Sequence, residues 1–186
     1  MYQCIDGIIT TERLILRPFT LDDADDVAAM CGTGIIQKTV LALPYPYTRE
    51  NAVDWISKHE EWRKTRKSYD FAVTDKETKT LYGTISLMMH VKDSPTAEMG
   101  YWIGERYWNC GYATEAACAM IEYAFSELML HRVFAQHFGS NIASGLVMKK
   151  AGMKHEGTLK AHYFKNGRYE DLVIYGIVSM DYDTYG

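Results

Sequence analysis

The sequence predicts an α+β fold in which helices cover a mixed β-sheet, and three periodic stretches carry that prediction. Residues 11–18 alternate apolar and charged side chains, which is typical of a strand with one solvated face. Residues 114–130 place small and apolar side chains at helical spacing. Residues 155–165 and 168–178 flank an Asn-Gly pair, a strong signal for a β-hairpin. Strands mixed with long helices indicate an α+β or α/β mixed sheet.

Two helices are expected between the first and second strands. Thr20 can cap an acidic helix over residues 22–30, whose first-turn aspartates suit the positive end of the helix dipole. After a polar, proline-marked stretch over residues 32–47, apolar side chains recur at helical spacing from Thr48 to about Lys67. This second segment predicts one continuous amphipathic helix.

The rest of the chain completes the sheet. Strands are predicted at residues 69–74, 81–91, 97–103 and 131–137, and a helix over residues 141–151 ends at Gly152. Gly100 lies inside one of these strands, where a glycine is typical of a bulge or of close approach by a ligand. The predicted order is β α α β β β α β α β β.

Length and composition limit the class of protein. The chain has 186 residues, of which 47% are hydrophobic and 24% charged, and this fits a single globular domain over residues 1–186. The formal net charge of −4 provides no general attraction to nucleic acid or to an anionic membrane. Because the apolar runs are short and the start is not basic, no membrane span or secretion signal is expected.

The four cysteines, at positions 4, 31, 110 and 118, have no CxxC or CxH spacing. Neither a zinc site nor a disulfide framework is expected, and no other metal constellation is visible. Reduced cysteines favour a cytoplasmic location. Cys110 has no histidine or cationic neighbour in the sequence, so it is not expected to be a catalytic thiol.

A glycine turn at residues 108–116 (WNCGYATEA) separates a predicted strand from a predicted helix. The free amides of a first helical turn and the helix dipole together favour an anion such as a diphosphate. Gly111 removes a side chain that would block close approach, and Ala113 keeps the turn small. The same arrangement is also a common way to turn a chain. Neither a GxxxxGK[ST] motif nor a GxGxxG after the first strand is present.

Ordered signatures surround this turn over most of the chain. They are residues 11–18 (TERLILRP), 98–103 (EMGYWI), 111–116 (GYATEA), 131–133 (HRV), 141–144 (NIAS), 150–153 (KAGM) and 166–171 (NGRYED). Together they resemble the GNAT acetyltransferase superfamily and, within it, the branch similar to ribosomal-protein N-terminal (alanine/serine) acetyltransferases. The turn is then more specific than a glycine before a helix.

The resemblance implies acetyl-CoA as the acyl donor, with CoA as product. It implies a mostly antiparallel, twisted sheet with helices on both faces, which splays between the strands at 97–103 and 131–137 so that the cofactor's pantetheine arm fills the gap. The residues carried over to cofactor binding are Met99, Gly100, Tyr101, Trp102, Ile103, Asn109, Cys110, Gly111, Tyr112, Ala113, Thr114, Asn141 and Ser144. Asn141 also suits a plain helix N-cap.

The same resemblance supplies three catalytic candidates. Ser144 matches a serine near the thioester sulfur and is the candidate acid for the leaving thiolate. Met148 stands where many members of the superfamily have a tyrosine that acts as the general acid, so a tyrosine in that role is not expected here. His162 stands where this branch often has a glutamate base, and Glu98, acting through a water, is the alternative base.

The expected activity is acetyl transfer by direct attack of an amine, most simply a protein or peptide N-terminal amine. A free α-amino group has a pKa near ~8 against about 10.4 for lysine, so a modest base suffices. A small-molecule amine, such as an antibiotic or polyamine, is the alternative acceptor. A catalytically silent CoA-binding module is a third hypothesis. Its grounds are Trp108, which replaces the usual Gln or Arg three residues before the motif glycine, Met148 in place of the tyrosine, and a base that the resemblance leaves open. Homodimers are frequent in this branch.

Overall fold

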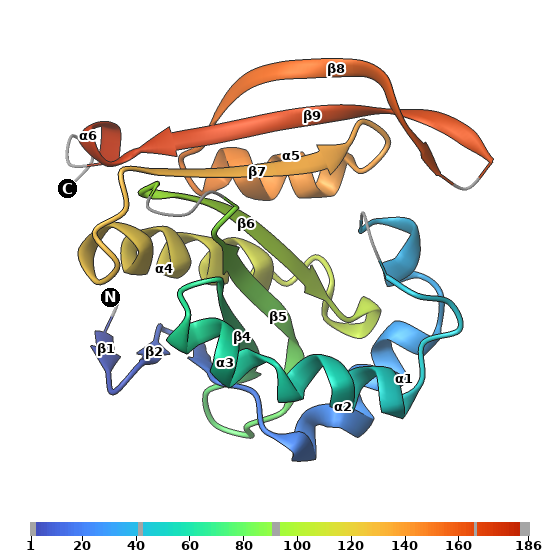
Figure 1. Cartoon of the computed structure of the whole chain (residues 1–186), viewed down its shortest axis with the longest axis vertical. Helices are drawn as coiled ribbons and strands as arrows, with labels where there is room; N and C mark the ends of the chain where they lie inside the picture. Colours follow the sequence, from blue (N-terminus) through green and yellow to red (C-terminus); the bar gives the residue numbers. More distant parts are fainter. Residues whose placement is uncertain (1–2, 41–42, 91–93, 166, 183–186) are drawn as a thin grey trace.

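The computed structural model describes residues 3–40, 43–90, 94–165 and 167–182 (Figure 1). Nine strands form one sheet in the order β1-β2-β3-β4-β5-β6-β7-β9-β8. The strands are β1 (Gln3–Ile5), β2 (Ile8–Thr10), β3 (Leu14–Arg17), β4 (Ser68–Asp75), β5 (Leu81–Met88), β6 (Thr96–Ile103), β7 (Arg132–Phe138), β8 (Lys154–Lys165) and β9 (Arg168–Val178).

All neighbouring strands in this sheet are antiparallel except β6 and β7. That parallel pair joins only residues 96–98 to residues 132–134, after which the two strands separate. The predicted splay between these strands is therefore confirmed. The bulge predicted at Gly100 is wrong, because β6 follows β5 in unbroken register and Gly100 lies opposite Ser86. Gly100 makes room for Met88, whose methyl carbon lies 3.0 Å from where a Cβ at position 100 would be, and it does not re-aim the backbone.

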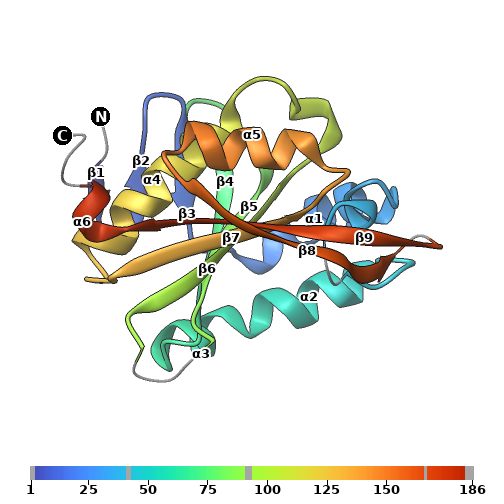
Figure 2. The same cartoon turned by 90° about the horizontal axis from the view of Figure 1, so that it is seen from above.

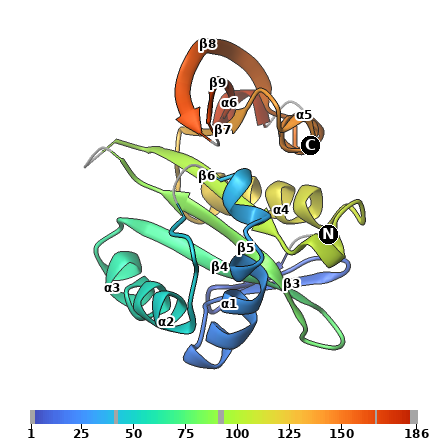
Figure 3. The ribbon, with the colours of Figure 1, turned by 90° about the vertical axis from the view of Figure 1, so that its right-hand side faces the viewer.

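Helices cover both faces of the sheet, as predicted. They are α1 (Ala24–Gly32), α2 (Arg49–Ser57), α3 (His59–Lys64), α4 (Tyr112–Ser126), α5 (Ile142–Lys150) and α6 (Ser179–Tyr182), with short 3-10 turns at Leu21–Asp23, Ile36–Lys38 and Glu105–Tyr107. Figures 2 and 3 show α2 and α3 on one face of β4–β6 and α4 on the other. Helix α5 lies on the same side as α4 and beside β7.

Two apolar cores follow from these layers. The larger core lies between α4 and the sheet, where the alternating side chains of β4–β6 meet the apolar stripe of the helix, as with Phe71, Ile85, Met99 and Met120. The smaller core lies under α1 and α2 and contains Val27 and Ile56 among others. Helix α4 on one face, and α1 and α2 on the other, thus each pack on the same sheet through a core of their own.

Three boundaries differ from the sequence prediction. The segment 48–67 is two helices, because Lys58 donates its backbone N–H to Trp55 and ends α2 with a tight turn. Helix α4 begins at Tyr112 and ends at Ser126, not over residues 114–130. The N-terminal hairpin β1–β2 was not predicted, although Asp6 and Gly7 form its turn with positive φ angles of 51° and 75°. At the predicted Asn166-Gly167 turn, Gly167 has φ of 79° and Asn166 lies outside the described residues.

In the part of the chain that the structure describes, no helix is long and apolar enough to cross a bilayer. No group of histidine, cysteine or carboxylate side chains among these residues has the arrangement of a metal site. All four cysteines are free thiols.

Candidate acetyl-CoA and acceptor site

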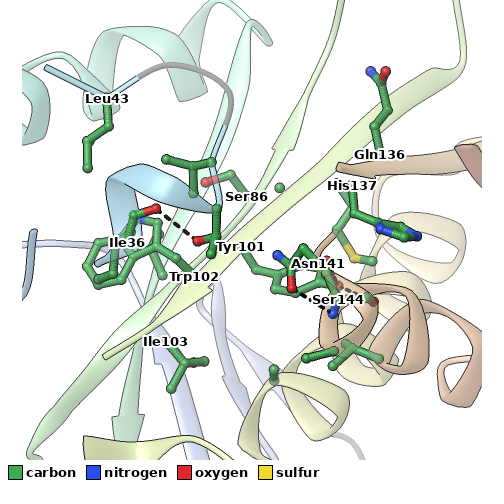
Figure 4. A pocket seen from close by; sticks show the side chains of 18 of the residues that line it. Ile36, Leu43, Ser86, Tyr101, Trp102, Ile103, Gln136, His137, Asn141 and Ser144 are labelled. Atoms are coloured by element: carbon green, nitrogen blue, oxygen red, sulfur yellow. Dashed lines mark hydrogen bonds between the residues drawn. The ribbon is translucent and has the colours of Figure 1, made fainter. Parts of the chain in front are cut away.

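A cavity of about 1000 Å³ lies where β6 and β7 separate. Its wall includes side chains from β4, β5, β6 and β7, from α2, from the first turn of α4 and from α5 (Figure 4). The cavity therefore reaches from the start of α4 on one side to the helices α1 and α2 on the other. Two reactants could meet within it, each entering from its own side of the sheet.

The turn before α4 has the backbone of an anion cradle. Asn109 and Gly111 have positive φ angles of 61° and 82°, and Gly111 occupies the N-cap position without a side chain that could cap the helix. The first-turn amides at positions 112–114 therefore have no side-chain acceptor at the N-cap and are open to an anion. Trp108 donates its indole N–H to the carbonyl of Ile103 at 2.6 Å, which ties the turn to the end of β6.

A charged link holds this turn against β3. The Arg13 guanidinium donates to Glu115 at 2.7 Å and to the carbonyl of Cys110 at 3.0 Å, and it lies 4.8 Å from the centre of the Tyr112 ring. Thr11 donates to the other oxygen of Glu115 at 2.6 Å. Burial alone would raise the pKa of Glu115, but the hydrogen bonds from Thr11 and Arg13 outweigh it and lower that pKa. The cradle is thus fixed from both ends of the turn.

The gap between β6 and β7 offers unpaired strand edges. Beyond residue 98, β6 pairs only with β5, so one edge of its backbone at residues 99–103 faces the cavity. An extended chain with amide groups could bind there in the manner of an added strand. The five predicted arm-binding residues of β6 all line the cavity: Met99, Gly100, Tyr101, Trp102 and Ile103.

Helix α5 presents a hydroxyl pair on the far side of this gap. Asn141 is the N-cap of α5 and accepts a hydrogen bond from the Ser144 amide at 3.3 Å, so the N-cap prediction is confirmed. The Tyr101 hydroxyl lies 2.9 Å from Ser144 Oγ and donates to the Ser144 carbonyl at 3.0 Å (Figure 4). Burial raises the pKa of Tyr101 to about 12, so this hydroxyl keeps its proton at neutral pH.

A carboxylate faces the same cavity from the start of β6. Glu98 Oε2 lies 2.5 Å from His90 Nε2, and Glu98 Oε1 accepts from the Gln136 amide at 3.0 Å. The side chain of Glu98 is 12% exposed and that of His90 is 54% exposed, so the imidazole connects a sheltered carboxylate to solvent. All three residues line the cavity.

The structure brings most of the predicted site together. Besides the residues of β6, the cavity wall includes Glu98, Asn109, Gly111, Tyr112, Ala113, Thr114, Asn141 and Ser144. Cys110 is exposed and contributes its backbone carbonyl to Arg13, and its thiol is outside the cavity wall. His162 lies exposed on β8 and is also outside that wall, because β8 is the outer strand beyond β9. Met148 is buried in the core against α4.

Sequence reasoning missed several residues of the wall. His90, just beyond the end of β5, contacts Glu98. Asp70, Ser86 and Gln136 were not considered, because their approach depends on the pairing register of β4, β5 and β7. The available signal in the sequence was a charged residue, Asp70, inside the predicted strand 69–74.

Comparison with known proteins identifies the family of this chain. Residues 13–154 match the family model of the acetyltransferase (GNAT) domain. The uncharacterized N-acetyltransferase YnaD of Bacillus subtilis is 32% identical over 94% of this chain and 99% of its own length. The ribosomal protein uS5-alanine N-acetyltransferase of Escherichia coli is 27% identical over 66% of this chain and 63% of its own length. A GNAT-family acetyltransferase structure from Bacillus anthracis, 28% identical, superimposes with a TM-score of 0.80 over 92% of this chain and 98% of that one.

The match to the family model covers well over half of the chain. The chain therefore belongs to the GNAT acetyltransferase family and is an N-acetyltransferase, for which acetyl-CoA is the co-substrate.

Proposed function

We propose that this enzyme acetylates a peptide or protein N-terminal amine, with Glu98 as the base and Ser144 as the group that meets the leaving thiolate. The observation that carries the proposal is the Glu98 carboxylate, which lines the cavity beside the splay of β6 from β7. The relationship to an enzyme that acetylates an N-terminal alanine of a ribosomal protein supports a peptide acceptor.

Acetyl-CoA supplies an acetyl group activated as a thioester. The open turn before α4, centred on Gly111, would hold the diphosphate by backbone amides, and the free edge of β6 near Tyr101 would bind the arm and donate to the thioester carbonyl. Arg13, from outside the cavity wall, and Trp108, which is part of the wall, would hold this turn in place.

Glu98 is suited to a base because an amine attacks only when neutral. Its carboxylate would accept the proton of the acceptor ammonium, directly or through one water, and His90 at 2.5 Å would pass that proton to solvent. A free α-amino group, with a pKa near ~8, is already partly neutral at physiological pH, so a carboxylate is a sufficient partner. We assign this role to Glu98 and not to His162, which lies outside the cavity wall.

Ser144 is suited to the opposite side of the reaction. When the C–S bond breaks, the thiolate needs a proton or a hydrogen bond, and the Ser144 hydroxyl lies on the α5 side of the gap. Tyr101, which stays protonated, donates to the Ser144 carbonyl, and its oxygen lies 2.9 Å from Ser144 Oγ, so it holds the serine in place beside the gap. The proton removed by Glu98 and the proton given by Ser144 thus travel on opposite sides of the sheet.

The test is a thiol-release assay with acetyl-CoA and a panel of acceptors: peptides with free alanine or serine N-termini, amino acids, polyamines and aminoglycosides. The expected result is the highest kcat/KM with peptides and no turnover with the same peptides already acetylated at the N-terminus. A faster reaction with an aminoglycoside or a polyamine would reassign the acceptor to a small molecule. CoA binding by calorimetry without turnover of any acceptor would identify a silent CoA-binding module.

A further inference from the structure

A buried carboxylate lies in the cavity wall away from the acetyl-CoA side. Asp70, on β4, is 6% exposed, and its Oδ1 accepts a hydrogen bond from the Ser86 hydroxyl at 2.6 Å. Its second oxygen, Oδ2, is shielded from solvent and has no hydrogen-bond partner. A buried carboxylate oxygen without a partner is costly, so it points to a group that is present only when the protein works.

Neither of the two basic residues of α3 that lie near this part of the sheet, His59 and Arg63, pairs with Asp70. The His59 ring is buried above this part of the sheet among Phe19, Trp55 and Trp62, and neither of its nitrogens has a hydrogen-bond partner. Burial lowers the pKa of His59, although Asp70 raises it, so the ring is neutral at physiological pH. His59 is therefore not a standing counter-ion for the carboxylate.

The Arg63 guanidinium is directed away from Asp70. Its guanidinium lies over the rings of Phe71 and Tyr69, at 4.7 Å and 5.8 Å from their centres. On β4 these two residues alternate with Asp70 and point to the opposite face. Among the described residues no ion pair includes Asp70.

The strand register connects Asp70 to the reaction centre. Asp70 lies opposite Ser86 on β5, and Ser86 lies opposite Gly100 on β6, so the three positions form one row on one face of the sheet. Figure 4 places Ser86 in the cavity wall near β6. Since adjacent strands are about 4.8 Å apart, Asp70 lies roughly 10 Å from Gly100. At Gly100 the row ends against the Met88 methyl group, which lies 3.0 Å from where a Cβ at position 100 would be.

The whole acceptor side of the cavity has an acidic character. The carboxylates in the wall are Asp54, Asp70 and Glu98, whereas Lys150 is the one lysine or arginine among the described lining residues. Asp54 is already paired with Lys58 at 2.5 Å, and Glu98 with His90 and Gln136. Asp70 is thus the lining carboxylate with an oxygen, Oδ2, that has no hydrogen-bond partner and can accept from a cation.

We propose that Asp70 and Ser86 form a subsite for a second cationic group on the acceptor, about two strands away from the amine that attacks. This inference rests on the proposed acetyl transfer and narrows its acceptor class. The required chemistry is a primary amine that also carries an ammonium or guanidinium group. Such a ligand is either a peptide with a basic residue next to its N-terminus or a polyamine.

The experiment measures selectivity with matched acceptors. One arm compares Ala-Lys-Ala amide with Ala-norleucine-Ala amide, and the other compares α,ω-diaminoalkanes of three to eight carbons with alkylamines of the same length. In the wild type, the dicationic member of at least one arm should have a kcat/KM at least about tenfold higher, as expected for a charge-assisted hydrogen bond. The arm in which the preference is larger identifies the source of the ligand.

Asp70→Asn is the decisive variant, because the amide can still accept from Ser86 but lacks the charge. It should bring the dicationic preference close to one while it leaves the kcat/KM of the singly charged acceptor in place. Asp54→Asn is the matched control, since Asp54 lines the same cavity but is paired, and it should retain the preference. Thermal unfolding of each variant establishes that the fold is intact.

Three outcomes contradict the inference: no dicationic preference in the wild type, an equal preference in Asp70→Asn, or an equal loss with both acceptors in that variant. The last result would make Asp70 a structural residue. If no acceptor is acetylated, the proposed function fails, and calorimetry decides the subsite separately. The diamine should then bind CoA-loaded wild type at least about tenfold more tightly than CoA-loaded Asp70→Asn, and equal affinities would overturn the subsite.

Discussion

The two sides of the cavity present different chemical groups, backbone on one and side chains on the other. On the cofactor side, the turn at Gly111 and the free edge of β6 present backbone groups, and side chains such as Arg13 act from outside by holding the backbone in place. On the acceptor side, the wall under α1 and α2 consists of side chains, with Asp70, Ser86 and Glu98 among them. We therefore propose that the cofactor side binds its ligand through backbone groups and that the acceptor side binds through side chains.

This difference explains what each side can tolerate. On the proposed function, a backbone cradle would bind its donor without help from the side chain of Cys110, which lies outside the cavity wall. A side-chain wall changes its ligand when a single residue changes. The proposed donor would thus depend on the fold, and the acceptor on individual residues.

The largest expected effect comes from Gly111→Asp. A side chain at φ of 82°, with its Cβ 3.3 Å from the Arg13 guanidinium, would put bulk and negative charge into the cradle. The Kd for CoA, measured by calorimetry, should rise at least about a hundredfold. Gly167→Asp is the control, because Gly167 has φ of 79° and open space around it. Equal CoA affinities for the two variants would show that the cradle does not bind the cofactor.

Glu98→Gln tests the acceptor side. The loss of a base should lower kcat/KM about a hundredfold near neutral pH, with the Kd for CoA unchanged. The defect should shrink as the pH rises through the pKa of the acceptor amine, near ~8, because a neutral amine needs no base. His162→Ala should retain the wild-type rate. A full-size defect for His162→Ala, with Glu98→Gln active, would exchange the two assignments.

Ser144→Ala tests the leaving-group step at the boundary of the two sides. We expect kcat to fall about tenfold, the effect of one lost hydrogen bond to a developing charge, with normal CoA affinity. Tyr101→Phe removes the support of Ser144 and should have a smaller effect of about threefold. Unchanged kcat in Ser144→Ala would remove the serine from the mechanism.

The smallest effect concerns alkaline stability. Burial raises the pKa of Cys31 and of Tyr47, both in the core under α1 and α2, to about 12. The unfolded chain ionises such groups at about 8.5 for cysteine and 10 for tyrosine, whereas the folded chain holds their protons. The contribution of these two groups to the free energy of unfolding should thus be constant below about pH 8.5 and fall as the pH rises towards 12.

Cys31→Ala isolates one of these contributions. Urea unfolding at pH 7.5 and 9.5 should give a stability loss smaller than that of the wild type by roughly 1 kcal/mol. The same loss in both proteins would mean that the thiol ionises equally in the folded state. Tyr101, on the cofactor side, contributes to the loss in both proteins and does not affect the difference.

The cofactor side was largely predictable from the sequence because its signals are local. The glycine turn, the helix that follows it and the N-cap at Asn141 each depend on residues close together in the chain. The splay between β6 and β7 was predicted through the family resemblance. The predicted bulge at Gly100 was wrong, because a glycine in an unbroken ladder can also make room for a neighbouring side chain, here Met88.

The acceptor side was not predictable in the same way. Asp70, Ser86 and Gly100 form a row only because of the register of three strands, which separate turns determine. His90 and Glu98 meet across a segment that includes residues 91–93, outside the described residues. The break of the second helix at Lys58 is a local tight turn, which periodicity alone does not reveal.

The most direct test of the account is a crystal structure with CoA bound. We predict the diphosphate on the first-turn amides of α4 next to Gly111, the pantetheine arm along the free edge of β6, and the thiol within hydrogen-bond reach of Ser144. A diphosphate bound elsewhere, with the start of α4 in contact with solvent alone, would contradict the assignment of that turn as the cofactor cradle.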